Sequence, residues 1–416
     1  MRVIVVGGGI AGLATATGLA RAGHEVKVFE RSTFSREVGA AINVCPNASR
    51  LLLQWGLDPR RSRMVTAKEQ RFIAGSSLQT VLQVDCSNFG ETYGAPSFLA
   101  HRVDLHSELR RLATQSRNPA QLVLGAAVEA FDPDGSVTLA DGSVHCADLI
   151  VAADGVHSTA VSAVDDHVAP ASSTGQAAFR FLIPTQTLAS DPETAPLLED
   201  GVVRILTGPD GRRLVWYPCS DGTIQNFVGI HPADNGEERE AWDLSATPSD
   251  VIAQYSDFHP TILSILSQAR DIKRWPLLYR EPMSSWTKGR LVLVGDAAHP
   301  MLPHQGQGGA QAIEDAGALY SVFKDIVGQP SEQDVQSRLR LFERIRLNRA
   351  SAIQVFSNAG QDEAEKVRQR AERFMVQGQR APATPAEYMQ HNFGYDVLKE
   401  SEAWIERARA IRSLGV

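Results

Sequence analysis

The sequence predicts an α/β fold with three parts: a Rossmann-like nucleotide-binding domain, an inserted and mainly antiparallel sheet, and a C-terminal helical region. Three observations predict it. A strand, a glycine-rich turn, a helix and a second strand open the chain. Short strands of alternating hydrophobicity run from about residue 172 to 275. A second glycine-rich stretch, Gly295 to Ala310, then follows a later apolar strand, which indicates that the insertion interrupts one nucleotide-binding domain.

The start of the chain predicts a strand–turn–helix–strand unit. Val3 to Val6 is an apolar, β-branched run, Gly7 to Gly12 (GGGIAG) is a turn, and Ile10 to Ala22 has helical spacing. The second strand, Val26 to Glu30, ends in an acidic side chain. Glycine allows a tight turn and a close backbone approach, the helix dipole favours a pyrophosphate, and the acid can accept ribose hydroxyls. A tight turn without a nucleotide is the alternative. The expected binding residues are Gly7, Gly9, Gly12 and Glu30.

The middle of the chain predicts the antiparallel sheet. Its strands include Ala177 to Ile183, Val202 to Leu206 and Gln225 to Ile230, separated by turn sequences such as GPDG and SDGT. We expect this sheet to form the floor of a substrate cavity.

Two residues of the inserted sheet are candidates for that cavity. Because side chains alternate along a strand, Phe179 and Phe181 point to one face and Arg180 to the other. Arg180 therefore lies either in solvent or in a pocket. Tyr217 precedes a turn, and its alternative is a tyrosine packed in the core.

The second glycine-rich stretch, GDAAHPMLPHQGQGGA, adds a carboxylate and a second helix start to the first turn. Asp296 follows the apolar strand Leu291 to Val294, and Gly306 to Gly309 precede a predicted helix, Ala310 to Tyr320. Asp296 could hydrogen-bond ribityl hydroxyls, and the backbone N–H groups of GQGG could approach a flavin ring. Asp296 as a helix N-cap is the alternative. A long ligand with phosphate, sugar and ring ends requires both glycine-rich segments, so together they predict FAD.

From Ser331 onward the chain is mostly charged, amphipathic helix, interrupted by the loop Ala381 to Pro385. Its aromatic residues are expected to pack a terminal cap, with covering the cavity or a dimer contact as alternatives; they are Phe374, Tyr388, Phe393, Tyr395 and Trp404. We predict a discontinuous FAD-binding domain at 1–70, 98–171 and 276–355, a substrate-binding domain at 71–97 and 172–275, and a helical cap at 356–416.

Composition narrows the class of ligand. The chain has 416 residues, 21% of them charged, and a formal net charge of −7, which does not indicate nucleic acid or an anionic membrane. The four cysteines lack CxxC or CxxH spacing, so we expect no metal, no disulfide framework, and buried or partly buried thiols. No segment approaches the roughly 18 apolar residues that span a bilayer. We therefore expect a soluble, cytoplasmic monomer or homodimer that binds small molecules.

A third motif, ADLIVAADGVHS, lies at Ala147 to Ser158 and contains a strand that ends in Asp-Gly. With this motif the chain resembles the single-component FAD-dependent aromatic hydroxylases (group A flavin monooxygenases), especially salicylate hydroxylase-like enzymes and their fungal secondary-metabolism relatives. The resemblance runs from residue 1 to about 360. It includes GAAINVCPNA from Gly39, HRVDL from His101 and FERIRLNRA from Phe342.

The resemblance implies a reaction. NADPH or NADH visits transiently and reduces FAD, O2 gives a flavin C4a-hydroperoxide, and its outer oxygen passes to an electron-rich carbon of an aromatic, phenolic substrate. The protein holds charge, excludes water and positions the substrate. The resemblance further implies that Pro303 borders the oxygen site, that Arg180 and Tyr217 act at the substrate, and that Arg102 and Asp154 lie beside FAD. The remaining cofactor-binding residues that we expect are Arg31, Ala41, Val128, Gly306, Gly308, Gly309 and Ala310.

One position departs from the family pattern. Val161 stands where the family usually has an arginine after the Asp-Gly motif, which serves both FAD and nicotinamide binding. The nicotinamide contact must therefore differ or be supplied elsewhere. Alternatives that the sequence leaves open are epoxidation, indole oxidation with rearrangement or hydroxylative dearomatisation by the same flavin chemistry, a flavin dehydrogenase or oxidase, and a nucleotide-binding protein without catalysis.

Overall fold

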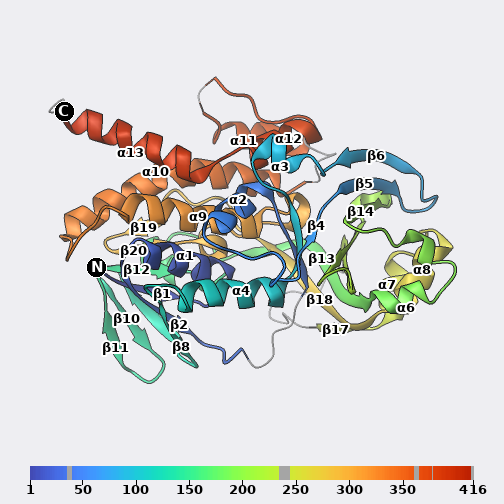
Figure 1. Cartoon of the computed structure of the whole chain (residues 1–416), viewed down its shortest axis with the longest axis horizontal. Helices are drawn as coiled ribbons and strands as arrows, with labels where there is room; N and C mark the ends of the chain where they lie inside the picture. Colours follow the sequence, from blue (N-terminus) through green and yellow to red (C-terminus); the bar gives the residue numbers. More distant parts are fainter. Residues whose placement is uncertain (35–39, 234–243, 360–364, 377, 414–416) are drawn as a thin grey trace.

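The computed structural model describes residues 1–34, 40–233, 244–359, 365–376 and 378–413. Two large sheets organise the chain, one near the N-terminus and one built mainly from the middle of the sequence (Figure 1). The helices of the last third lie along one side of the molecule, above the N-terminal sheet in this view.

The N-terminal sheet has six strands in the order β19-β20-β12-β1-β2-β8 and is parallel except for β19. Residues Val3 to Val6 are each at most 5% exposed, as expected for a parallel sheet that helices cover. Helices α1 (Ile10–Arg21), α4 (Arg102–Thr114) and α9 (Gly308–Phe323) share its core. The strands are β1 (Arg2–Val6), β2 (Glu25–Glu30), β8 (Gln121–Leu124), β12 (Leu149–Ala152), β19 (Thr287–Lys288) and β20 (Leu291–Leu293).

The second sheet has eight strands in the order β17-β18-β13-β16-β15-β14-β5-β6. Neighbouring strands are antiparallel except β14 and β5, which are parallel. The strands are β5 (Glu69–Ala74), β6 (Thr80–Asp85), β13 (Ser172–Pro184), β14 (Val202–Thr207), β15 (Arg213–Cys219), β16 (Ile224–Pro232), β17 (Leu244–Ala246) and β18 (Arg270–Tyr279).

The two faces of the eight-stranded sheet have different surroundings. On one face, Phe179, Trp216 and Phe227 form a core with helices α7 (Pro248–Gln254) and α8 (Pro260–Ser267), which lie beyond the sheet in Figure 1. Side chains that alternate with these three point to the other face. That second face is turned toward the nucleotide-binding part of the chain and forms a cavity wall.

Smaller elements connect the sheets. One three-stranded sheet has the order β3-β7-β4 and another the order β11-β10-β9. The strands are β3 (Ala41–Val44), β4 (Val65–Thr66), β7 (Phe98–His101), β9 (Val128–Asp132), β10 (Ser136–Leu139) and β11 (Val144–Cys146). The remaining short helices are α2 (Pro46–Gln54), α3 (Phe89–Tyr93), α5 (Ala160–Val164), α6 (Thr185–Ala189) and 3-10 turns at Ala195–Leu197, Pro209–Gly211, Gly295–Ala297 and Pro303–Gln305.

The C-terminal region is helical. Helix α10 (Glu332–Phe356) begins with a capping box. The Ser331 hydroxyl accepts a hydrogen bond from the Asp334 N–H, and the Asp334 carboxylate accepts one from the Ser331 N–H. It is followed by α11 (Arg368–Glu372), α12 (Pro385–Phe393) and α13 (Val397–Ser413). The predicted fold class is thus confirmed: a Rossmann-type domain, an antiparallel sheet and a helical C-terminal region.

Several details differ from the prediction. The helix expected from Ala310 begins at Gly308, and Cys146 is exposed, whereas Cys45, Cys86 and Cys219 are buried as expected. The domain division stays a prediction, although its boundaries at 70/71 and 275/276 fall inside β5 and β18. Both strands are continuous in the eight-stranded sheet, so each is better kept whole. Of the helices in the described ranges, none combines the length and the apolar character that crossing a membrane requires.

Candidate active site

Glycine is required at two positions of the first turn. Gly7 has φ of 102°, and a Cβ there would lie 2.3 Å from the carbonyl oxygen of Ala153. A Cβ on Gly12 would lie 1.9 Å from the carbonyl oxygen of Gly7. Gly9 is the N-cap of α1, and a Cβ on it would meet no atom within 4 Å. The first N–H groups of α1 therefore face an open cradle that fits a pyrophosphate.

Glu30 ends β2 beside this turn. Its carboxylate oxygens accept hydrogen bonds from the N–H groups of Gly8 (2.6 Å) and Ser32 (2.7 Å), which fix its position. Arg31 follows with an exposed side chain. Val128 lies two residues beyond Ala126, whose N–H donates to the Glu30 carbonyl oxygen (2.9 Å). These predicted residues therefore gather at the end of β2, outside the cavity lining.

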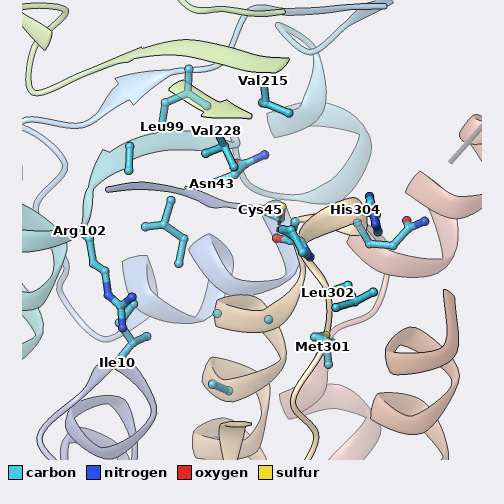
Figure 2. A pocket seen from close by; sticks show the side chains of 18 of the residues that line it. Ile10, Asn43, Cys45, Leu99, Arg102, Val215, Val228, Met301, Leu302 and His304 are labelled. Carbon is cyan, nitrogen blue, oxygen red and sulfur yellow. Dashed lines mark hydrogen bonds between the residues drawn. The ribbon is translucent and has the colours of Figure 1, made fainter. Parts of the chain in front are cut away.

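A cavity of about 400 Å³ lies between the start of α1 and the eight-stranded sheet. Figure 2 shows Ile10 and Arg102 at one end, Leu99, Val215 and Val228 along one wall, and Met301, Leu302 and His304 on another side. The predicted site residues that line this cavity are Gly9, Ala41, Arg102, Arg180, Tyr217, Asp296, Pro303, Gly306, Gly308 and Gly309.

Asp296 faces the cavity from the 3-10 turn that follows β20. The turn shows no side-chain cap hydrogen bond, and Gln307 is the N-cap of α9, so the N-cap alternative for Asp296 is wrong. Its side chain is exposed to the cavity. Enclosure by protein raises its pKa, while His299 and Arg102 oppose the shift. The carboxylate can therefore accept hydrogen bonds from hydroxyl groups of a bound ligand.

A buried network supports the turn that carries Asp296. Asp315 of α9 accepts the Gly295 N–H (2.9 Å) and contacts Nε2 of His299 (2.7 Å). Arg346 of α10 donates to Asp315 (2.9 Å), and all three side chains are fully buried. Burial by itself would raise the pKa of Asp315, but His299 and Arg346 hold it below its usual value. An ionised Asp315 thus anchors the turn.

The second glycine segment opens α9 at the cavity. Gly306 has φ of 62°, in the left-handed region that favours glycine. A Cβ on Gly309 would lie 2.7 Å from Cδ1 of Ile42. The side chain of the N-cap residue, Gln307, does not cap the helix, which leaves the first N–H groups of α9 for a ligand. Pro303 lines the cavity, whereas the Ala310 side chain is 1% exposed and packs in the core behind it.

Arg180 points into the cavity and not into bulk solvent. Phe179 and Phe181, its neighbours in β13, are buried in the core on the opposite face. Among the described residues Arg180 forms no ion pair, and its buried Nε has no hydrogen-bond partner. Burial and the nearby Arg102 lower its pKa. Its guanidinium carbon lies 5.1 Å from the ring centroid of Trp275.

Tyr217 and Arg102 line the same cavity from other elements. Tyr217 of β15 is 6% exposed, and burial raises the pKa of its hydroxyl, which therefore stays protonated and can donate a hydrogen bond. Arg102 opens α4, and its backbone N–H donates to the carbonyl oxygen of Ala40 (3.0 Å). Its side chain is exposed to the cavity, and no ion pair joins it to another described residue.

Asp154 lies behind the glycine turn. Its neighbours Ala153 and Gly155 line the cavity, but Asp154 does not. One of its oxygens, Oδ1, is buried without a hydrogen-bond partner, and burial raises the pKa of the carboxyl. A donor from a ligand at the turn would satisfy this oxygen. Gly7, Gly12 and Ala310 likewise shape the site without lining the cavity.

Sequence reasoning missed part of the lining. Strand alternation could have found apolar wall residues such as Val203 and Ile205, because they share a face of β14. Phe393 was expected first to pack a terminal cap, with covering the cavity as an alternative, and it reaches the cavity from α12. Nothing in the local sequence indicates this, because the contact joins segments far apart in the chain.

Comparison with known proteins agrees with this architecture. A family profile described as "FAD binding domain" matches residues 1–357. Over 411 residues the chain is 41% identical to FAD-dependent monooxygenase cfoG of Aspergillus candidus, a match that covers 96% of this chain and 94% of that protein. Over 425 residues it is 31% identical to hispidin-3-hydroxylase of Neonothopanus nambi, with 98% and 96% covered.

Solved structures share the fold. CtdE, crystallised with FAD and a substrate, has a TM-score of 0.82 at 21% identity, covering 99% of this chain and all of that one. A salicylate hydroxylase substrate complex has a TM-score of 0.74 at 23% identity, covering 97% and 98%. The family match and the two sequence relatives establish more than the fold: this chain belongs to the FAD-binding-domain family and is an FAD-dependent monooxygenase.

Proposed function

We propose that this chain uses NAD(P)H and O2 to hydroxylate a phenolic ring held in the cavity. Arg180 is the observation that carries the proposal. It is a cation that faces a cavity and forms no direct ion pair with any partner among the described residues, although the charge of Asp296 acts on it. A phenolate oxygen would provide that partner and would favour the ionised ring. An ionised ring is more electron-rich at its ortho and para carbons, which suits attack by an electrophilic oxygen.

The wall around Arg180 supports an aromatic ligand. Val203, Ile205, Val215 and Val228 present apolar surface from the eight-stranded sheet. Such surface excludes water and packs against a ring. Tyr217 adds a hydroxyl that can donate a hydrogen bond to the same phenolate. Hispidin-3-hydroxylase, by its name a hydroxylase, is consistent with ring hydroxylation here.

The two glycine-rich segments fit FAD. We assign the pyrophosphate to the start of α1, the adenosine ribose to Glu30, the ribityl hydroxyls to Asp296, and the flavin ring to the backbone N–H groups of Gly306 to Gly309. When bound, FAD accepts two electrons from a nicotinamide and activates O2. Arg31, Val128 and Asp154 would support the adenosine and turn side, and Pro303 the ring side. The oxygen-transfer route implied by the family resemblance stays a prediction.

The nicotinamide dinucleotide needs a binding contact other than the usual arginine. Val161, at the usual arginine position, lies in α5, is 7% exposed and packs in the core of the six-stranded sheet. It therefore offers no charge to a visiting dinucleotide. We infer that NADH or NADPH is bound by residues outside this motif.

Anaerobic reduction of the FAD-loaded protein tests the proposal. NADH, NADPH and a panel of phenols are added singly and in pairs while flavin absorbance is followed. We expect bleaching by one nicotinamide, faster when a phenol is present. Bleaching by an organic compound alone would contradict the proposal, since it would mean a dehydrogenase or oxidase. Product analysis after aerobic turnover then separates hydroxylation from epoxidation, rearrangement or dearomatisation.

A further inference from the structure

Phe393 brings the C-terminal region to the cavity. It is the last residue of α12, beyond residues 1–357 that the family profile matches. Its side chain is 7% exposed and lines the cavity. It shares a hydrophobic cluster with Tyr217, Val203 and Leu99, which line the same space. The ring is therefore part of the cavity wall that carries the substrate-facing residues of the sheet.

Two further aromatic rings fix the orientation of Phe393. The ring centroid of Tyr93 lies 5.6 Å from that of Phe393, at an interplanar angle of 82°. The ring centroid of Phe89 lies 5.6 Å from that of Phe393 and 5.2 Å from that of Tyr93. Tilted and edge-to-face pairs at these separations are favourable. Neither Phe89 nor Tyr93 lines the cavity, whereas Phe393, which packs against both rings, does.

Arg50 of α2 holds the backbone at Phe393. Its guanidinium donates to the carbonyl oxygens of Tyr93 (3.1 Å), Tyr395 (3.0 Å) and Phe393 (2.9 Å). The last carbonyl groups of a helix lack partners within the helix, and a cation is favourable there. One guanidinium thus joins α2, the end of α3 and the end of α12.

A second arginine ties the same helix end to the glycine segment of the cofactor site. Arg349 donates to the carbonyl oxygens of His391 (2.6 Å) and Asn392 (2.9 Å), and pairs with Glu314 (3.2 Å). Glu314 also accepts a hydrogen bond from Asn47, which donates as well to Gln307. Gln307 is the N-cap of α9, so the position of Phe393 is coupled to the segment that we assign to the flavin ring.

We propose that Phe393 sets the size of the aromatic ring system that the cavity admits, and that Arg50 is the residue that positions Phe393. This proposal rests on the proposed function, because it needs a phenolic ligand in the cavity. Removal of the phenyl group would leave apolar space in the cavity wall, and apolar protein cavities can bind an aromatic ring.

The test compares phenol with 4-phenylphenol. Each is titrated into the FAD-loaded protein, and its Kd is measured from the change in flavin absorbance. In Phe393→Ala we expect the ratio of the 4-phenylphenol Kd to the phenol Kd to fall by about tenfold. Phe393→Leu, which keeps more packing, should shift the ratio in the same direction by less. Phe89→Leu makes the same change in a ring that packs on Phe393 but does not line the cavity, and it should shift the ratio by less than Phe393→Leu, because it acts only through the orientation of Phe393.

The positioning role of Arg50 needs a separate comparison. Arg50→Ala removes the cation that holds the Phe393 carbonyl group, while Arg349 still holds those of His391 and Asn392, and it should lower the same Kd ratio while the FAD content per protein stays constant. Arg50→Lys keeps a cation with fewer donors and should restore part of the ratio. An Arg50→Ala protein with an unchanged ratio would overturn the positioning role.

The outcomes separate this inference from the proposed function. Suppose that the unsubstituted protein binds phenols, and that Phe393→Leu and Phe393→Ala both have the same Kd ratio as the unsubstituted protein. The inference on Phe393 is then overturned, and the phenolic function stands. If neither phenol perturbs the flavin of the unsubstituted protein, the phenolic substrate class fails and the inference fails with it.

Discussion

At the scale of single residues, Asp296 is the clearest test of the cofactor site. Its carboxylate is exposed to the cavity, and the turn beneath it is anchored by Asp315. Hydrogen bonds to a charged group contribute about 1.5 to 3 kcal/mol, so Asp296→Ala should weaken FAD binding by about 10- to 100-fold. Titration of FAD into the apoprotein measures the Kd for FAD. Asp296→Asn keeps one acceptor oxygen and should lose less, whereas full FAD retention by Asp296→Ala would refute the assigned role.

Arg180 should affect the substrate and leave FAD in place. Its guanidinium lies in the cavity wall, and the residues that we assign to FAD come from other elements. We expect Arg180→Ala to retain FAD and to weaken phenol binding by about tenfold or more, because a charge-assisted contact is lost. Arg180→Lys restores the charge without the planar fork and should recover part of the affinity. Equal phenol affinity in the alanine variant would remove Arg180 from the substrate site.

At the scale of elements, the contact between α9 and α10 depends on Arg346. This arginine is fully buried and donates to Asp315 (2.9 Å) and to the side chain of Gln311 (2.8 Å), and it also pairs with Glu314. Arg346→Met would remove from the buried carboxylates Glu314 and Asp315 a cation that they share, at a cost of about 3 to 5 kcal/mol in the free energy of unfolding. Because Asp315 anchors the Asp296 turn, FAD retention should fall as well.

Arg340→Met is the matched control for Arg346, because Arg340 is exposed on the same helix. Its effect on the free energy of unfolding should stay within about 0.5 kcal/mol. Urea unfolding of both variants gives the comparison. If Arg346→Met cost no more than Arg340→Met, the buried network would not be what joins the two helices.

At the scale of the whole molecule, stability should depend on pH through His24. This histidine precedes β2, is 1% exposed, and contacts the carbonyl oxygen of Phe323 at the end of α9 (3.1 Å). Burial, with the N-terminal ammonium as a second cause, lowers its pKa to about 4. Above pH 6.5 the imidazole of His24 is neutral in both the folded and the unfolded chain. Below it the unfolded form binds a proton first, so stability falls until the pH reaches about 4.

The expected loss from His24 is about 2 kcal/mol between pH 7.5 and pH 5, at 1.36 kcal/mol for each pKa unit. Urea unfolding at the two pH values measures it, and His24→Gln should show a smaller loss. His167→Gln changes an exposed histidine and should leave the pH dependence as it is. A His24→Gln protein with the same pH dependence as the unsubstituted chain would show that His24 does not titrate on unfolding.

The sequence by itself determined the fold class and the two cofactor segments. Gly7, Asp296 and Gly306 could be predicted because their roles are local: a turn, a strand end and a helix start each follow from a few neighbouring residues. Strand alternation also limited Arg180 to one of two environments. Strand alternation could not show whether Arg180 faces solvent or a pocket, because that depends on what covers each face of the sheet.

Only the tertiary structure decided how the cavity is closed. Helices α7 and α8 cover the face with Phe179 and Phe181, and this leaves Arg180 and Tyr217 facing the cofactor segments. Phe393 joins them from α12, held by carbonyl contacts to Arg50 across more than 340 residues of sequence. Local patterns specify elements, whereas such long-range packing is settled by which buried surfaces meet when the chain folds.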